Sequence, residues 1–186
     1  NFFFSFKTNF ILRISGLPKL NIIRKYFWKL TLKKIYHITC PTKATMKLIK
    51  KHKLSNSEKI SVLYDPIISN KFIINKKKEK FDEGTIKVKN FYLAIGRLTK
   101  QKNFGFLVDV FSEFSKSKNN NLIIIGDGEE KESLQELIKK KKLNDKIFLI
   151  GFKNNVFKYF ERSKCFVLSS LWEDPGFVLV ESAYMN

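Results

Sequence analysis

The 186-residue sequence has few residues that could hold a metal ion or a disulfide, and no apolar run long enough to span a membrane. Its two cysteines, Cys40 and Cys165, and its two histidines, His37 and His52, lie outside any metal-ligand spacing. A zinc site and a disulfide framework therefore have little support. Isolated thiols are typical of a reducing compartment, so we expect a cytoplasmic protein.

Acidic residues are also scarce, with 17 Asp and Glu against 36 Lys and Arg, which gives a net charge of +19. The imbalance is concentrated in residues 1–90, where 21 Lys and Arg face five Asp and Glu. Such a charge favours a nucleic acid, an anionic membrane surface or a phosphorylated ligand as partner. Lysines that only solvate the surface explain it equally well. A hydrophobic fraction of 44% excludes an intrinsically disordered chain.

The first sixty-odd residues are predicted to be mostly helical. The stretch 21–39 places six apolar residues near one helical face, Ile22, Ile23, Tyr26, Phe27, Leu30 and Ile35. Residues 41–54 begin with helix-starting residues. A short strand is predicted over 59–66. Residues 69–89 are polar and charged and have no period, which indicates a linker or domain boundary.

Residues 90–186 alternate regularly between short apolar runs and stretches with helical spacing. The apolar runs are 91–96, 121–126, 145–151 and 164–170, and the helical stretches between them are 103–116, 129–142 and 155–163. Continuous apolar strands that alternate with helices are typical of a parallel sheet covered on both faces. This part is predicted to be a Rossmann-like α/β domain with at least four strands.

The ends of these strands carry the candidate ligand-binding residues, because open parallel sheets bind ligands there. Gly126 and Gly128 do not complete a dinucleotide fingerprint, since Lys131 stands where the third glycine is needed, and a tight turn explains both. Arg97 and Lys102 on the first loop suit a diphosphate, although a solvated loop would also explain two cations.

The final motif, SSLWEDPGFVLVESAYMN, is more specific. Gly176 lets the backbone approach a ligand, and Phe177 begins a helix whose amides can face an anion. The carboxylate of Glu181 has two acceptor oxygens for neighbouring sugar hydroxyls, and Glu173 would lie on the other side of the same pocket. The alternative is an exposed loop acid followed by an ordinary first-turn glutamate.

The sequence resembles the C-terminal, nucleotide-sugar-binding domain of the retaining GT-B glycosyltransferases of family 4. The resemblance is carried by four motifs that occur in the same order as in that family, GRLTKQKN, IIIGDGEE, IFLIGF and the final motif. Glu173 and Glu181 match the E-x7-E signature of that family. The resemblance covers residues 60–186, and more weakly residues 11–60. It implies a mostly helical remnant of the N-terminal domain at 1–68, a linker at 69–89, and an incomplete Rossmann-like domain at 90–186.

The resemblance also implies a role for seven residues. They are Arg97 and Lys102 at the donor diphosphate, Glu181 at the ribose, Glu173 as the catalytic carboxylate near the donor sugar, Gly176 and Phe177 as backbone contacts, and Phe152 on the loop beside the base. It implies a metal-independent enzyme without a cofactor, in which the UDP- or GDP-linked sugar donor is a substrate.

We therefore expect a transferase that moves a sugar to a glycan or lipid-linked acceptor in polysaccharide assembly. The alternatives are a module that binds a nucleotide sugar without turnover, and a basic polyanion-binding protein, although no nucleic-acid recognition motif is present. The basic segment 10–34 is expected either to rest on the cytoplasmic face of an anionic membrane or to pack against the sheet of the N-terminal domain, most of which we expect to be missing from this sequence. We expect the sequence to be a fragment cut at both ends and inactive alone.

Overall fold

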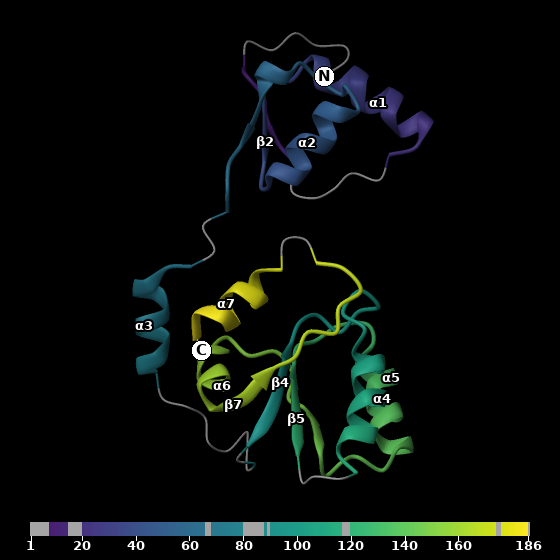
Figure 1. The fold of residues 1–186 in the computed structure, drawn as a ribbon, viewed down its shortest axis with the longest axis vertical. Helices are drawn as coiled ribbons and strands as arrows, with labels where there is room; N and C mark the ends of the chain where they lie inside the picture. The colour runs from purple at the N-terminus through teal and green to yellow at the C-terminus, as the bar shows by residue number, and fades with distance from the viewer. Residues whose placement is uncertain are drawn as a thin grey trace. The chain divides into compact units, whose positions relative to one another are not determined.

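The computed structural model describes residues 8–14, 20–65, 68–79, 88, 90–116, 120–173 and 176–185. The chain forms two compact units, Asn1–Pro66 and Ile67–Asn186 (Figure 1). None of the described helices is long and apolar enough to cross a membrane.

The first unit is built on a parallel three-stranded sheet with the order β1-β2-β3. Its elements are β1 (Ile11–Arg13), α1 (Ile22–Lys33), β2 (His37–Cys40), α2 (Lys43–Lys51), the 3-10 helix η1 (Ser57–Lys59) and β3 (Ile60–Val62). The two α-helices and β3 were predicted from the sequence. Strands β1 and β2 were not, because they are three and four residues long and adjoin segments with helical spacing.

Four of the six residues of the predicted apolar stripe lie away from the core of this unit, whereas Ile35, which follows the end of α1, packs against it. Ile22, Ile23, Tyr26 and Phe27 are 60–90% exposed, whereas Leu32 of the same helix is fully buried. The helix therefore packs on the sheet through its C-terminal half, and its N-terminal half presents large apolar side chains among basic ones.

The second unit contains the predicted α/β domain. Its four parallel strands have the order β6-β5-β4-β7. The strands are β4 (Phe91–Ile95), β5 (Asn121–Ile125), β6 (Ile147–Leu149) and β7 (Ser163–Phe166), and the helices are α3 (Asn70–Lys78), α4 (Phe104–Phe114), α5 (Lys131–Lys140), α6 (Phe157–Arg162) and α7 (Phe177–Met185). Every strand and helix predicted over 90–186 is present, and Phe177 begins α7 as expected.

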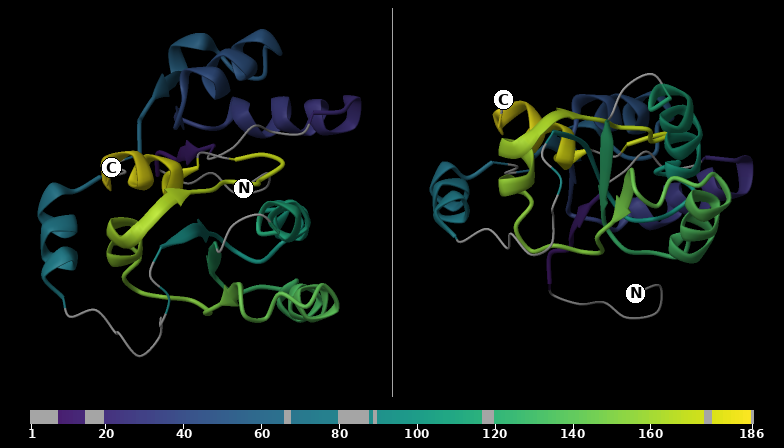
Figure 2. Two further views of the ribbon diagram at one scale, coloured as in Figure 1. Left: turned by 60° about the horizontal axis from the view of Figure 1, so that its bottom comes forward. Right: turned by 90° about the horizontal axis from the view of Figure 1, so that it is seen from below.

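Helices cover both faces of this sheet, as its continuous apolar strands require (Figure 2). Leu122 and Ile124 of β5 pack into a cluster with side chains of α4 and α5. Ile123 and Ile125 of the same strand pack into a second cluster with α3 and α6. The strand thus contributes alternate side chains to two cores, because successive residues of a strand point to opposite faces.

Helix α3 corrects the prediction of a linker for residues 70–78. Ser69 caps the helix by accepting a hydrogen bond from the amide of Phe72 at 3.4 Å. Ile73 is 2% exposed, and the ring of Phe72 meets that of Phe157 edge to face. The lysines of this stretch obscured the apolar pair, which packs against α6 together with an ion pair between Lys77 and Glu161 at 3.1 Å. Residues 80–87 and 89 of the predicted linker lie outside the described residues.

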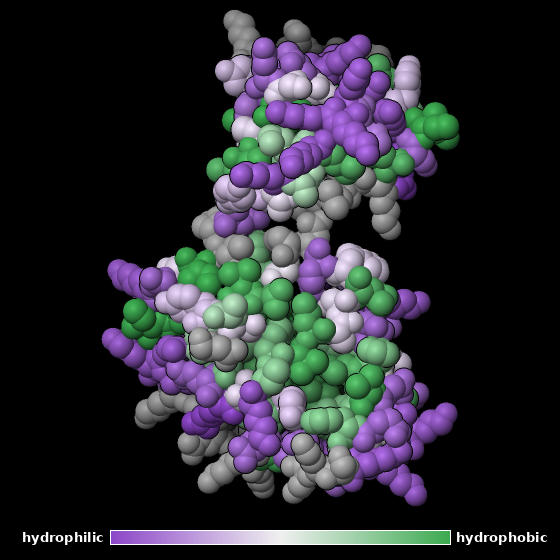
Figure 3. All heavy atoms as spheres, viewed as in Figure 1, coloured by the Kyte–Doolittle hydropathy of each residue, from purple (hydrophilic) through white to green (hydrophobic). Residues whose placement is uncertain are grey.

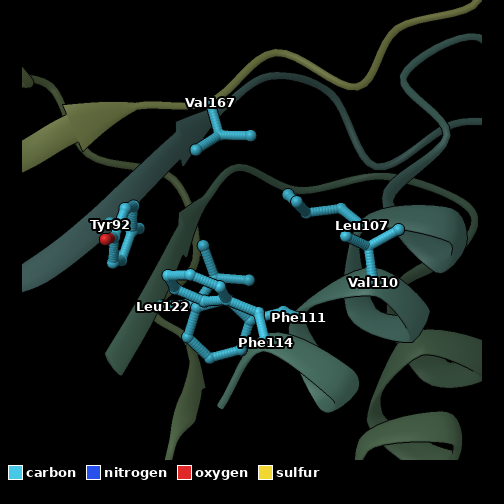
Figure 4. A pocket seen from close by; sticks show the side chains of 7 residues that line it. All are labelled: Tyr92, Leu107, Val110, Phe111, Phe114, Leu122 and Val167. Carbon is cyan, nitrogen blue, oxygen red and sulfur yellow. The ribbon is translucent and has the colours of Figure 1, made fainter. Parts of the chain in front are cut away.

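Apolar side chains gather on one face of the second unit (Figure 3). A groove on this unit is lined by seven apolar or aromatic side chains, those of Tyr92, Leu107, Val110, Phe111, Phe114, Leu122 and Val167 (Figure 4). Since no charged side chain lines it, the groove has nothing with which to bind a phosphate.

Candidate active site

Backbone hydrogen bonds join the loops that follow β4, β5 and β6. The amide of Gly126 donates to the carbonyl of Gly151 at 3.0 Å, and the amide of Leu98 donates to the carbonyl of Asp127 at 2.9 Å. A Cβ atom added at Gly126 would lie 1.8 Å from the carbonyl oxygen of Gly96. Glycine at 126 is therefore required by the close approach of two loops, in addition to the turn that the sequence predicted.

The loops after β4 and β7 are joined by three further hydrogen bonds. The carbonyl of Gln101 accepts from the amide of Leu171 at 2.9 Å, and the side-chain amide of Gln101 donates to the carbonyl of Trp172 at 2.9 Å. The hydroxyl of Ser169 donates to the carbonyl of Lys102 at 2.8 Å. All four loops at the carboxyl edge of the sheet thus form one connected rim.

Glu173 and Lys102 meet at this rim. The Lys102 Nζ lies 2.6 Å from Oε1 of Glu173, and the hydroxyl of Ser170 donates to the same oxygen at 2.6 Å. Only 12% of the Lys102 side chain and 20% of the Glu173 side chain are exposed. Burial alone would raise the pKa of Glu173, but the hydrogen bonds from Lys102 and Ser170, with the charge of Lys102, hold this pKa below its ordinary value. Glu173 is therefore ionised at neutral pH.

Gly176 lies close to the side chain of Glu173. Its φ of +77° lies in the left-handed region that favours glycine, and an added Cβ would lie 3.1 Å from Cβ of Glu173. The sequence predicted that Gly176 lets the backbone approach a ligand. In the described structure its immediate neighbour is the Glu173 side chain, so this glycine also sets where the carboxylate can lie.

Glu181 lies in α7, in surroundings unlike those of Glu173. Burial raises its pKa above the ordinary value. Within the described ranges no hydrogen bond or ion pair reaches its carboxylate. Phe177, at the start of the same helix, is 41% exposed. A partly buried acceptor without a donor is suited to bind a ligand that brings hydroxyl groups.

Arg97 and Phe152 lie at the same carboxyl edge, on the loops after β4 and β6. Arg97 is exposed, and Phe152 is 71% exposed. The structure thus brings Lys102 and Glu173 into contact and places Arg97, Phe152 and Gly176 on loops of the same rim. In the described part of the chain, no group of three His, Cys, Asp or Glu side chains could hold a metal ion.

Ser170 was not predicted as a site residue. It lies three positions before Glu173 in an irregular loop, where residue spacing does not show which way a side chain points. Its hydrogen bond to Glu173 depends on how the loop after β7 folds back onto the loop after β4.

Together these features describe a parallel α/β unit with a paired lysine and glutamate at the carboxyl ends of its strands, which is where such sheets bind ligands. The chain belongs to the family of glycosyl transferases group 1, whose family model matches residues 75–186. An uncharacterized glycosyltransferase of Methanocaldococcus jannaschii is 37% identical over 165 residues, which are 87% of this chain and 40% of the relative.

Another relative is an N-acetylgalactosaminyltransferase of Campylobacter jejuni whose name specifies a diphospho-undecaprenol substrate. It is 37% identical over 92 residues, or 50% of this chain and 25% of the relative. Among solved structures, HepE of Anabaena in complex with UDP and glucose is similar with a TM-score of 0.67 and 16% identity, over 94% of this chain and 50% of HepE. The solved neighbours are GT-B glycosyltransferases, and the fold is of that type. The chain spans half or less of the length of these three proteins.

Proposed function

We propose that the protein transfers a sugar from a UDP- or GDP-linked donor to a glycan or lipid-linked acceptor, with retention of configuration. The observation that carries the proposal is the contact of Lys102 with Glu173 at the carboxyl edge of the sheet, in a member of this family. The UDP and glucose bound by HepE and the diphospho-undecaprenol in the name of the Campylobacter relative support the two substrate classes.

Arg97 and Lys102 would bind the donor diphosphate. Among the described residues the Arg97 side chain has no hydrogen bond or ion pair, so its guanidinium is available to grip phosphate oxygens bidentately. Lys102 is already paired with Glu173, but its ammonium has three donors. Lys102 can therefore bind a phosphate oxygen while it keeps its contact with Glu173.

Glu173 would act at the donor sugar and Glu181 at the ribose, with Phe152 beside the base and with Gly176 and Phe177 as backbone contacts. In the transfer, the bond from the anomeric carbon to the diphosphate breaks, and its electron pair leaves with the diphosphate. The acceptor oxygen forms the new bond to that carbon and its proton passes to the departing diphosphate. Cations at the diphosphate and a carboxylate near the positively charged sugar stabilise both developing charges.

Calorimetric titration of UDP, GDP, uridine and guanosine into the folded chain tests this proposal. We expect saturable binding of one nucleoside diphosphate and much weaker binding of its nucleoside. Arg97→Met should reduce the diphosphate affinity about tenfold, as expected for the loss of a charged hydrogen-bonding group. Lys139→Met, an exposed change at the far end of α5, is the control and should have little effect. A folded chain that binds no nucleotide, or an Arg97→Met variant that binds like the wild type, would contradict the proposal.

A second proposal concerns the first unit, whose surface suits peripheral contact with an anionic membrane. Residues 1–66 contain 14 Lys and Arg against two Asp and Glu. On α1 the exposed Ile22, Ile23, Tyr26 and Phe27 stand among Arg24, Lys25 and Lys29. Apolar side chains that insert among lipids and cations that attract anionic headgroups are the two elements of interfacial binding.

Pelleting with vesicles of neutral lipid and of neutral plus anionic lipid tests the membrane proposal. We expect the chain to pellet with the anionic vesicles and to be released by salt. The double change Ile23→Asn with Phe27→Asn should weaken pelleting, because it removes apolar side chains that the described unit does not bury. Binding that ignores lipid charge would contradict the electrostatic part of this proposal.

A further inference from the structure

The two carboxylate oxygens of Glu173 differ in the hydrogen bonds that they accept. Both Lys102 Nζ and Ser170 Oγ contact Oε1, each at 2.6 Å. In the described part of the chain no hydrogen bond reaches Oε2. With one oxygen held by two donors, the plane and direction of the carboxylate are fixed while the other oxygen stays free to accept from a ligand.

We propose that Ser170 is a positioning residue, which fixes the Glu173 carboxylate so that Oε2 faces the donor sugar. This inference rests on the proposed function. Ser170 does not touch the sugar itself; its hydroxyl holds the oxygen that the sugar does not use.

Lys102 cannot hold Glu173 in one orientation by itself. Its ammonium ends a flexible four-carbon chain and acts as a mobile point charge. When a diphosphate binds, Lys102 divides its donors between phosphate and Glu173. The Ser170 hydroxyl has a short side chain and no competing role, so it is the donor that remains unchanged during donor binding.

The backbone on either side of Ser170 is anchored to the loop after β4. Ser169 donates its hydroxyl to the carbonyl of Lys102, and the amide of Leu171 donates to the carbonyl of Gln101. Ser170 is therefore placed by two flanking hydrogen bonds that do not involve its own side chain. Its hydroxyl can be removed without releasing the loop, which makes the role separable by mutation.

The first test compares the free nucleotide with the nucleotide sugar. Calorimetry with UDP and UDP-glucose, and with GDP and GDP-mannose, identifies the pair that the wild type binds. Ser170→Ala should lower the affinity for the nucleotide sugar about five- to tenfold and leave that for the free nucleotide unchanged. Ser170→Thr, which keeps the hydroxyl, should restore sugar binding. Ser133→Ala, which removes a hydroxyl hydrogen bond to the backbone carbonyl of Glu130 at the start of α5, is the control for loss of a serine hydroxyl.

A double-mutant cycle distinguishes positioning of Glu173 from a general structural role. If Ser170 acts through Glu173, then Ser170→Ala should add no further loss in a Glu173→Gln background, whereas an independent role would give additive losses. Equal losses for nucleotide and nucleotide sugar, or additive losses in the cycle, would overturn the inference. A wild type that binds none of the four ligands would instead overturn the proposed function.

A second measurement does not require a donor. Carbon-13 NMR of the side-chain carboxyl of Glu173 should show that Ser170→Ala raises its pKa, since the variant loses a hydrogen bond to the ionised form. Ser170→Thr and Ser133→Ala should leave this pKa unchanged. An unchanged pKa in folded Ser170→Ala would overturn the inference whether or not a donor binds.

Discussion

The loop after β7 and the first turns of α7 carry the two acids of one motif in opposite surroundings. Glu173 lies on the loop, and two donors hold its carboxylate in the ionised form. Glu181 lies on the helix, where burial raises its pKa and no described residue supplies a donor. The sequence spacing does not distinguish the two acids. In the structure, the carboxylate of Glu173 already has two hydrogen-bond donors, whereas the carboxylate of Glu181 has none among the described residues.

The different surroundings of Glu173 and Glu181 suit the two carboxylates to different roles. A fixed, ionised carboxylate costs little to reorganise and suits a position beside a developing positive charge. A partly buried carboxylate without donors destabilises the folded chain slightly and regains that free energy when a ligand donates hydrogen bonds. These properties agree with the proposed roles of Glu173 at the sugar and Glu181 at the ribose.

The largest expected effect comes from breaking the rim that holds Glu173. Gly126→Ala places a Cβ atom 1.8 Å from the carbonyl oxygen of Gly96, so the two loops must separate. We expect a loss of about 3 kcal/mol in the free energy of unfolding, measured by urea denaturation. Gly105→Ala is the control, because its Cβ would meet nothing within 4 Å, and alanine favours the helix. Equal stability of the two variants would contradict the account of the rim.

The second-largest change in stability is expected for Lys102→Met, which removes the charged partner of Glu173. The ion pair is largely shielded from water, so we expect a loss of about 1–2 kcal/mol in the free energy of unfolding. Lys116→Met breaks a pair of similar length, Lys116 with Glu113 at 2.7 Å, whose side chains are 66% and 71% exposed. That control should change stability by less than about 0.5 kcal/mol. Equal losses would show that burial does not distinguish the two pairs.

Glu173→Gln should destabilise the chain in a pH-dependent way. Because the folded-state pKa of Glu173 is lowered, its ionised form adds stability above the ordinary pKa, and this stability disappears as the pH falls through the lowered value. We expect the free energy of unfolding to fall by about 1 kcal/mol at neutral pH and to be unchanged in acid. Thermal unfolding of the variant and the wild type across the pH range measures this difference. A loss that is constant with pH would not come from this ionisation.

Glu181→Gln should have the smallest effect and the opposite sign. Because burial raises the folded-state pKa of Glu181, the stability linked to its protonated form is complete below the ordinary pKa and is lost as the pH rises through the raised value. The variant avoids that loss, so we expect it to exceed the wild type by about 0.5 kcal/mol at neutral pH and to match it in acid. Destabilisation at neutral pH would indicate that Glu181 has a favourable partner.

The α/β domain, and the gathering of the candidate site residues at one edge of its sheet, could be predicted from the sequence because both depend on local patterns. Apolar runs such as NLIII define strands, and parallel topology brings the residues that follow them to one edge. Helix α3 was missed because only one of its residues, Ile73, is buried, and its other contacts with α6 are one aromatic contact and an ion pair of Lys77 with Glu161. Helix α3 is stabilised by tertiary contacts, which the spacing of residues in the sequence does not reveal.

The contrast between the two acids could not be predicted either. The ionisation of Glu173 depends on Lys102, which is 71 positions away in the sequence and comes close only when two loops fold together. The burial of Glu181 depends on which side of α7 faces the rest of the unit. Residue type and spacing located both acids, and long-range packing set their chemistry.

The central claim is that Glu173 serves the donor sugar and Glu181 the nucleotide, and one calorimetric comparison tests it most directly. The affinities of Glu173→Gln and Glu181→Gln for a nucleoside diphosphate and for its sugar conjugate are compared with those of the wild type. The account predicts that Glu181→Gln weakens both ligands equally and that Glu173→Gln weakens the sugar conjugate alone. If both variants weaken both ligands alike, or if Glu173→Gln leaves the sugar conjugate unaffected, the division of roles is contradicted.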